Sequence, residues 1–204
     1  HLWNLGLLPT LTLLIGVMYP MLLSEHRISR RGVSILRWTT PGISILFVGV
    51  GAVWLELNGK LGIALLPIVA ASAANSAIQA PVWFRAVLSE AEGDPRWMSG
   101  IALPANVLAV LTLLVPWSDP VKSVTAMLVA LLVGNSCLLL LMVSRGVGIT
   151  TLAGTPRSGV RSRSGAGWFL ARSGIGQIAV VLIQSTAVLL PASNLTILSV
   201  ATKI

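Results

Sequence analysis

Six long apolar stretches follow one another along this chain, and they constrain its fold more than any other feature. As a helix, an apolar stretch of about 20 residues can cross the roughly 30 Å hydrocarbon core of a bilayer. One such stretch could also be a buried helix of a soluble protein. Six in succession, joined by polar loops, predict an all-α protein that is a polytopic transmembrane helix bundle. The predicted spans are residues 2–23, 41–55, 61–84, 101–117, 124–143 and 173–191.

Charged residues are scarce, and they lie between the apolar stretches. Only 10% of the residues are charged and 55% are hydrophobic, whereas about a quarter of the residues of a soluble domain are charged. The formal net charge of +8 would suit a protein that binds nucleic acid. The arginines that produce it have no soluble scaffold to present them, so we expect membrane lipids and no nucleic acid as partners.

The basic residues alternate between the predicted loops. Short cytoplasmic loops of membrane proteins are enriched in Lys and Arg. The second and fourth loops carry only Lys60 and Lys122. We therefore predict that the first, third and fifth loops are cytoplasmic. Their basic residues, 11 of the 14 in the chain, are Arg27, Arg30, Arg31, Arg37, Arg85, Arg96, Arg145, Arg157, Arg161, Arg163 and Arg172.

The fifth predicted loop, residues 144–172, is longer than the others and rich in Gly, Ser and Arg. We interpret it as a basic cytoplasmic linker between two lobes. Residues 1–143 are then membrane helices of an N-terminal lobe, and residues 173–204 begin a second lobe. Because the chain starts at His1 inside an apolar stretch and stops as a new pattern begins, we expect it to be a piece of a longer protein, with the first helix missing.

Two helix starts are marked by a capping residue before a proline. Thr40 precedes Pro41, and Asp119 precedes Pro120. Ser, Thr and Asp are favoured at the N-cap, and proline is favoured in the first helical turn, where its missing N–H is not needed. The pattern predicts that helices begin at these two places.

The predicted spans carry no charged side chain near their middle. A charge there costs on the order of 3 kcal/mol on insertion scales and is usually functional when present. Its absence argues against a proton pump, a voltage sensor or an ion relay built from these helices. The chain also lacks a paired set of catalytic residues, a metal-ligand cluster and a glycine-rich phosphate loop. We therefore expect no enzyme activity, no cofactor and no metal.

Uncharged polar residues do occur in the spans, and in the third span they are periodic. Ser72, Ser76 and Gln79 recur at spacings of four and three, with Asn75 beside them, so they share one helix face. Such a face turns away from lipid, because an unpaired amide in hydrocarbon costs a few kcal/mol. Asn135 lies in the fifth span. The candidate cavity residues are Ser72, Asn75, Ser76, Gln79, Asn106, Gln177 and Gln184.

Two interpretations of these polar residues stay open. In the first, they form hydrogen bonds between helices and hold the bundle together. In the second, they line a hydrophilic cavity that solvates a polar headgroup. Prolines inside the spans, such as Pro9, Pro20 and Pro81, allow helices to bend and mildly favour a transporter.

Three segments together resemble the MOP superfamily of flippases, and within it the MurJ (MviN) type that moves lipid-linked peptidoglycan precursor. The segment Tyr19–Glu25 is similar to the end of the second helix of that family. The segment from Val87 to Asn106 is similar to its fourth-to-fifth-helix junction, and the segment from Gly176 to Lys203 is similar to its seventh helix and the following turn. The resemblance covers nearly the whole chain in organisation and about a quarter of it in sharp motifs.

The resemblance implies that the chain corresponds to helices two to seven of a two-lobed transporter in the bacterial cytoplasmic membrane. It implies a flippase that moves a lipid-linked oligosaccharide or a lipid II-like peptidoglycan precursor by alternating access. The substrate would be a polyprenyl-linked glycan, and cell-wall synthesis enzymes are candidate partners. One departure concerns Leu7–Thr10, which carries no charge where the MurJ type has arginines that attract the pyrophosphate.

Several alternatives remain. A multidrug or cation exporter of the same superfamily would normally need a membrane carboxylate. A permease subunit of an ABC importer is suggested by the segment from Glu90 to Pro104, which is about five residues too short for the coupling loop of those subunits. A non-transporting membrane scaffold for cell-wall assembly would be indicated by a large soluble domain.

Overall fold

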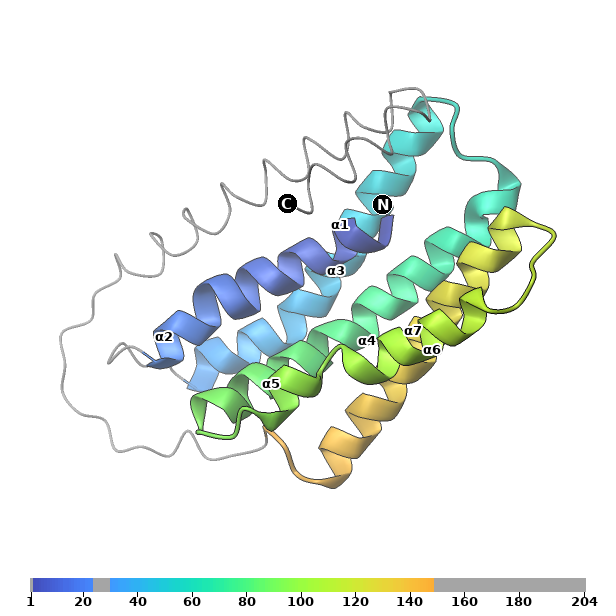
Figure 1. Cartoon of the computed structure of the whole chain (residues 1–204). Coiled ribbons are helices and arrows are strands. Elements are labelled where there is room, and N and C mark those ends of the chain that lie inside the picture. Colours follow the sequence, from blue (N-terminus) through green and yellow to red (C-terminus); the bar gives the residue numbers. More distant parts are fainter. Residues whose placement is uncertain (1, 24–29, 149–204) are drawn as a thin grey trace, which may run out of the picture.

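The computed structural model describes residues 2–23 and 30–148 (Figure 1). Within these residues every regular element is a helix, so the predicted all-α class is confirmed. The predicted linker from residue 149 onward and the sixth predicted span lie outside the described residues, as does the predicted start of a second lobe.

The first span is a single helical rod with a change of hydrogen-bond register in its middle. It consists of α1 (Leu2–Thr10), the π-helix η1 (Leu11–Met18) and α2 (Tyr19–Leu23). At the end of η1 the N–H of Tyr19 donates to the carbonyl of Leu14, five residues earlier. Pro9 and Pro20 each lack an N–H, so the irregular segment lies between two points at which the α-helical ladder is interrupted.

The second rod, α3 (Arg30–Leu57), begins well before the predicted start at Pro41. The prediction that Thr40 caps a new helix is wrong, because its Oγ1 donates to the carbonyl of Leu36 inside the helix at 2.6 Å. The extra turns are stabilised by packing, since Val33 and Leu36 contact a core cluster that includes Leu14 and Phe84. Tertiary contact here overrides the local signal of a capping residue and a proline.

A tight turn with Gly59 at a φ of +64° connects α3 to the short helix η2 (Ile63–Leu65). The helix α4 (Leu66–Ala91) follows directly. Glycine has no Cβ and adopts positive φ without strain, so Gly59 suits the reversal. The rod of η2 and α4 returns to the end of the bundle at which the chain entered α3 (Figure 1).

The fourth predicted span is shorter in the structure than the sequence indicates. Within residues 101–117 the only α-helix is α6 (Leu103–Leu113), which has 11 residues, and the short helix α5 (Arg96–Gly100) precedes it. Pro104 lies in the first turn of α6, and the helix ends before Pro116, because proline disfavours helical geometry in the residue that precedes it. The predicted span of residues 101–117 is therefore too long: the helix begins two residues later and ends four residues earlier.

The last described helix, α7 (Pro120–Ser144), begins where the sequence predicts. The carboxylate of Asp119 accepts a hydrogen bond from the N–H of Val121 at 2.8 Å, and Pro120 occupies the first turn. Four helical segments are long and apolar enough to cross a membrane, and they cover Leu5–Leu22, Gly32–Leu57, Ile63–Ala91 and Pro120–Ser144. The described part of the chain is thus compatible with a membrane protein.

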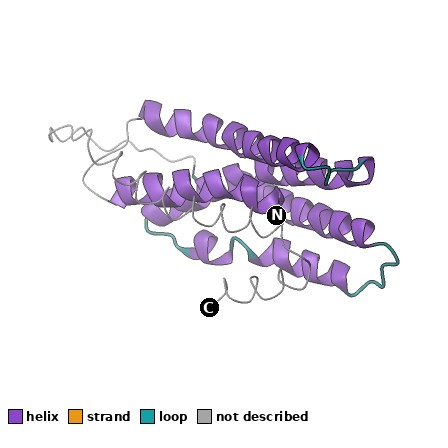
Figure 2. Ribbon diagram, turned by 90° about the horizontal axis from the view of Figure 1, so that it is seen from above, coloured by secondary structure: helices purple, strands orange, loops and turns teal. Residues whose placement is uncertain are grey.

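Successive rods run in opposite directions along the bundle, so α4 and α7 are parallel, and α4 is central (Figures 1 and 2). Helix α4 contacts α1, α3 and α7, while α6 packs against α7. Outward faces of α3, α6 and α7 carry large exposed apolar side chains such as Phe47, Val110 and Leu140. A soluble monomer rarely exposes apolar area so widely, and a bilayer would cover these faces.

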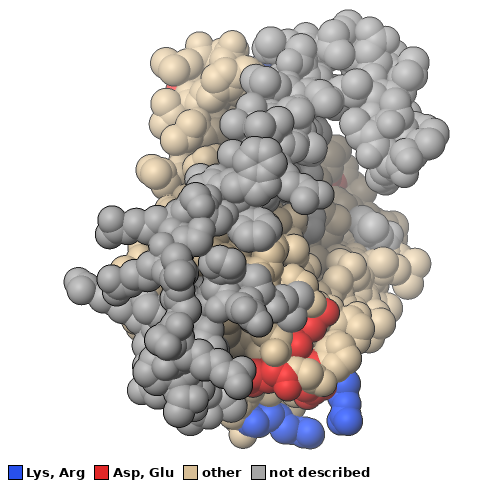
Figure 3. All heavy atoms as spheres, turned by 90° about the vertical axis from the view of Figure 1, so that its left-hand side faces the viewer, with Lys and Arg blue, Asp and Glu red and all other residues tan. Residues whose placement is uncertain are grey.

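Charged side chains lie at both ends of the bundle, and the described arginines lie at the end where α2, α4 and α7 end and α3 and α5 begin. Figure 3 looks onto this end and shows acidic and basic side chains close together. We call it the basic end. The arginines there whose side chains the structure describes are Arg37, Arg85, Arg96 and Arg145. The opposite end carries Lys60 and Lys122. The fold therefore groups the described basic residues in the way that the predicted orientation requires.

Candidate functional site

A group of uncharged polar side chains lies inside the bundle between α4 and α7. We call Ser72, Asn75, Ser76 and Asn135 the polar cluster. These four residues are 1%, 0%, 1% and 3% exposed, respectively. The Nδ2 of Asn135 donates to the Oδ1 of Asn75 at 2.8 Å, across 60 residues of sequence. This hydrogen bond connects the two helices that make the most extensive contact in the bundle.

Two atoms of the polar cluster lack a partner among the described residues. They are the Oγ of Ser72 and the Nδ2 of Asn75. The Oγ of Ser76, in contrast, donates to the carbonyl of Ser72 one turn earlier, at 2.8 Å. A buried donor without a partner costs on the order of 1–3 kcal/mol. The cluster therefore has unused capacity to bind a polar group.

Helix α1 covers the polar cluster from the side opposite α7. A Cβ added at Gly6 would lie only 1.9 Å from the Oγ of Ser76 and 2.7 Å from Cγ2 of Val48. Only glycine permits so close an approach of α1 to α4. Nearby, the Oγ atoms of Thr10 and Ser44 form a buried hydrogen bond of 3.0 Å between α1 and α3. Hydrogen bonds between uncharged side chains thus link α1 to α3 and α4 to α7, and close packing at Gly6 joins α1 to α4.

The remaining candidate cavity residues lie elsewhere. Gln79 is half-buried one turn beyond Asn75 on α4, and Asn106 is exposed on α6. Gln177 and Gln184 lie outside the described residues. The structure therefore brings together three of the predicted residues, namely Ser72, Asn75 and Ser76.

The residues predicted to set the orientation are only partly described. Arg37 is exposed on α3, and Arg30 and Arg31 lie in the first turn of the same helix. The other four, Arg27, Arg157, Arg161 and Arg163, lie outside the described residues.

The sequence does not indicate which residues of other helices contact Ser72, Asn75 and Ser76 on α4. Asn135 was recognised only as a polar residue in the fifth span, and its pairing with Asn75 is a long-range contact without a local signal. Thr10 and Ser44 were not singled out, because single hydroxyls in apolar helices commonly bond to their own backbone. A small residue on a neighbouring helix, here Gly6, is the one sequence signal that could have indicated which helix packs against these polar residues.

The chemistry available to the polar cluster is hydrogen bonding. Its four side chains are amides and hydroxyls, which donate and accept hydrogen bonds without changing charge near neutral pH. Within the described residues no three His, Cys, Asp or Glu side chains gather in a metal-binding arrangement. The cluster can hold hydroxyl, amide or water groups.

Comparison with protein-family models, with curated proteins and with solved structures gives no match for this chain. The resemblance to MOP superfamily flippases stays a prediction from the sequence.

Proposed function

We propose that this chain is part of a membrane transporter of the flippase type. It would move the polar headgroup of a lipid-linked oligosaccharide, or of a lipid II-like peptidoglycan precursor, across the bacterial cytoplasmic membrane by alternating access. The observation that carries the proposal is the polar cluster, an uncharged and incompletely paired group buried between helices long enough to span a bilayer.

The energetics of the substrate favour such an interior. A sugar headgroup cannot cross hydrocarbon unaided, because its hydroxyl and amide groups would be stripped of water. A path lined by amides and hydroxyls replaces the lost hydrogen bonds. It does so without the cost of a charge at the membrane centre, and the polar cluster contains only such groups.

The packing supports an interpretation of the structure as a closed arrangement. Asn75 pairs with Asn135, and the backbone of Gly6 lies against Ser76, so α7 and α1 seal the cluster on two sides. Opening requires one of these helices to move away from α4. The rod that contains α1 is suited to bending, because it combines Pro9, the π-helix Leu11–Met18 and Pro20.

A second function is favoured by one observation. The hydrogen bond between Asn135 and Asn75 also suits a non-transporting scaffold, in which polar pairs only hold helices together. The two functions differ in whether the cluster ever meets water or substrate. A scaffold needs the pair permanently closed, whereas a transporter needs it to open.

The test of the proposal is rescue of cells depleted of their lipid II flippase by the complete reading frame that contains this chain. We expect rescue by the wild type and loss of rescue by the double variant Asn75→Leu/Gln79→Leu, with equal amounts of protein in the membrane by immunoblot. The matched control is Asn106→Leu, which makes the same change at an exposed position and should still rescue.

The two contrary outcomes bear on different parts of the proposal, the substrate and its path. If the wild type is inserted and abundant but does not rescue, transport of lipid II is excluded and another lipid-linked glycan must be tried. If the double variant rescues as well as the wild type, the chain belongs to a transporter, but Asn75 and Gln79 do not line its substrate path.

A further inference from the structure

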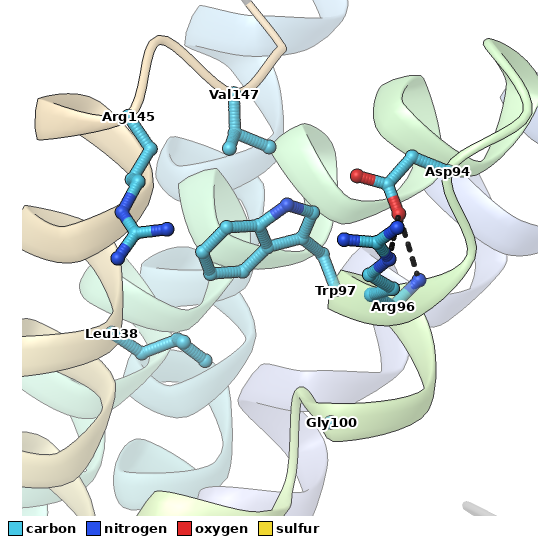
Figure 4. Close-up of a pocket in the computed structure, with 7 residues that line it drawn as sticks. All are labelled: Asp94, Arg96, Trp97, Gly100, Leu138, Arg145 and Val147. Carbon is cyan, nitrogen blue, oxygen red and sulfur yellow. Dashed lines mark hydrogen bonds and ion pairs between the residues drawn. The ribbon is translucent and has the colours of Figure 1, made fainter.

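A cavity opens at the basic end of the bundle, between α5 and the end of α7 (Figure 4). Its volume is about 460 Å³. The cavity is independent of the polar cluster and has a different composition. Its walls combine an indole, two aliphatic side chains, one carboxylate and two guanidinium groups, from Asp94, Arg96, Trp97, Gly100, Leu138, Arg145 and Val147.

Two arginines face each other across the indole of Trp97. Arg145 reaches in from the end of α7, and Arg96 lies on the opposite side at the start of α5 (Figure 4). Asp94 neutralises part of this charge, since its Oδ1 lies 3.7 Å from the Nε of Arg96 and accepts a hydrogen bond from the N–H of Arg96 at 3.2 Å. Arg145 forms no ion pair with a carboxylate of the described residues.

A third arginine lies behind the wall. The Nη1 of Arg85, from α4, donates to the carbonyl of Val147, a residue that lines the cavity. The backbone of Gly148 also lies against Arg85, because a Cβ added there would be 3.0 Å from the Cα of Arg85. The lining thus carries two positive charges and one negative charge, and a further positive charge stands directly behind it.

The surroundings of the cavity are those of a membrane interface. It lies at the ends of α4 and α7, two of the helices long and apolar enough to cross a bilayer. Large apolar side chains are exposed along α7 just before Arg145, among them Leu140, Leu141 and Val143. Trp97 is half-buried in the floor, and indole prefers the headgroup layer of a bilayer.

We propose that this cavity binds the phosphate headgroup of an anionic phospholipid of the surrounding membrane. Arg96 and Arg145 clamp the phosphate over the indole of Trp97, and the acyl chains extend along the apolar surface of α7. Basic pockets between transmembrane helices on the cytoplasmic side bind anionic lipid headgroups in this way. The distribution of basic residues predicts that this end is cytoplasmic.

A lipid fits the cavity better than a soluble anion does. A free phosphate would use the two guanidinium groups and leave the indole and the exposed leucines without a partner. A lipid uses both parts, because its headgroup is charged and its chains are apolar. The proposal does not depend on transport, so it can fail or succeed separately from the proposed function.

The experiment measures lipid binding by the purified protein in detergent with native mass spectrometry. Phosphatidylglycerol and phosphatidylcholine are compared, and each arginine near the surface should strengthen binding of the anionic lipid about fivefold. The double variant Arg96→Gln/Arg145→Gln should bind phosphatidylglycerol roughly 25-fold more weakly than the wild type. The matched control is Arg37→Gln, an exposed arginine of the same end that does not line the cavity.

A gain of binding provides a test that misfolding cannot imitate. Asp94→Asn removes the one negative charge of the lining, so it should strengthen binding of phosphatidylglycerol about fivefold. Weaker or unchanged binding by this variant, or equal loss in Arg37→Gln and in the double variant, would overturn the proposal. Displacement of the lipid by millimolar inorganic phosphate would also overturn it and assign the cavity to a soluble anion.

Discussion

The two polar regions of this molecule differ in charge according to their depth in the bundle. The polar cluster around Asn75 and Asn135 is buried in the interior and contains no ionisable group. The cavity at the basic end contains Arg96, Arg145 and Asp94, and both arginines are exposed. A bilayer around the bundle would account for the difference, because a charge at its centre costs on the order of 3 kcal/mol while a charge at its surface stays hydrated.

The comparison also separates two kinds of stabilisation. In the interior, the two amide side chains have no access to water, and a hydrogen bond between them takes its place. At the basic end the ion pair of Arg96 with Asp94 competes with water, since the side chain of Arg96 is 91% exposed. We therefore expect substitutions in the polar cluster to change stability, and substitutions at the basic end to change binding. Three of the following four predictions test this division, and the other tests the packing of α6 against α7.

The largest effect is expected when a charge is moved into the interior. Asn75→Lys should reduce membrane insertion or stability by about 3 kcal/mol, the cost of a charge at the membrane centre. Ser99→Lys is the matched control, because it adds the same charge at an exposed position of α5. Folded yield after detergent extraction, measured by size-exclusion chromatography, checks both variants. Equal yields for the two would contradict the assignment of Asn75 to a membrane interior.

The next effect concerns a close contact between α6 and α7 at Gly134. A Cβ at Gly134 would lie 2.6 Å from the Cα of Ala105, so Gly134→Ala forces the helices apart and should destabilise the protein by about 1–3 kcal/mol. Gly49→Ala is the control, because a Cβ at that position on α3 meets nothing within 4 Å. Thermal unfolding in detergent compares them, and a similar midpoint for both variants would show that α6 does not pack in this way.

A smaller effect is expected for the amide pair itself. A double-mutant cycle with Asn75→Leu and Asn135→Leu should give a coupling energy of about 0.6 kcal/mol, the average for hydrogen bonds between transmembrane helices, and at most about 1.7 kcal/mol. The measurement is the free energy of unfolding in mixed micelles for the wild type, both single variants and the double variant. Additive effects, without coupling, would mean that the two side chains do not interact.

The smallest effect is expected at the basic end. Arg96→Ala removes an exposed ion pair with Asp94, and such pairs contribute little to stability. Its unfolding midpoint should match that of the wild type at low and at high salt. A loss as large as that of Asn135→Leu would show that the two polar regions do not divide their roles as the comparison requires.

Local signals predicted some elements of the fold well. Asp119 and Pro120 marked the start of α7, because the cap needs only residues next to one another. The periodicity of Ser72, Asn75 and Ser76 likewise indicated a polar face of one helix, and all three are buried.

Other elements depend on contacts between distant parts of the chain. The start of α3 was placed too late, because packing of Val33 and Leu36 against the core extends the helix through Pro41. The pairing of Asn135 with Asn75 and the approach of Arg145 to Trp97 arise only when α7 takes its place in the bundle. No local pattern could have predicted them.

The central claim is that the polar cluster lies on a path that opens to water, and cysteine labelling in cells tests it most directly. The chain has one cysteine, so Cys137→Ser gives a cysteine-free background for this chain. Ser72→Cys then probes the cluster, Val129→Cys probes an exposed apolar position on α7, and Asn58→Cys probes the turn after α3.

The reagent is a membrane-impermeant maleimide. The account predicts labelling at position 58 at all times, no labelling at position 129, and slow labelling at position 72 that increases while the cells synthesise cell wall. If the polar cluster only holds the helices together, position 72 will stay unlabelled, as position 129 does. That result, from protein that is inserted and active in the rescue assay, would contradict the proposed path.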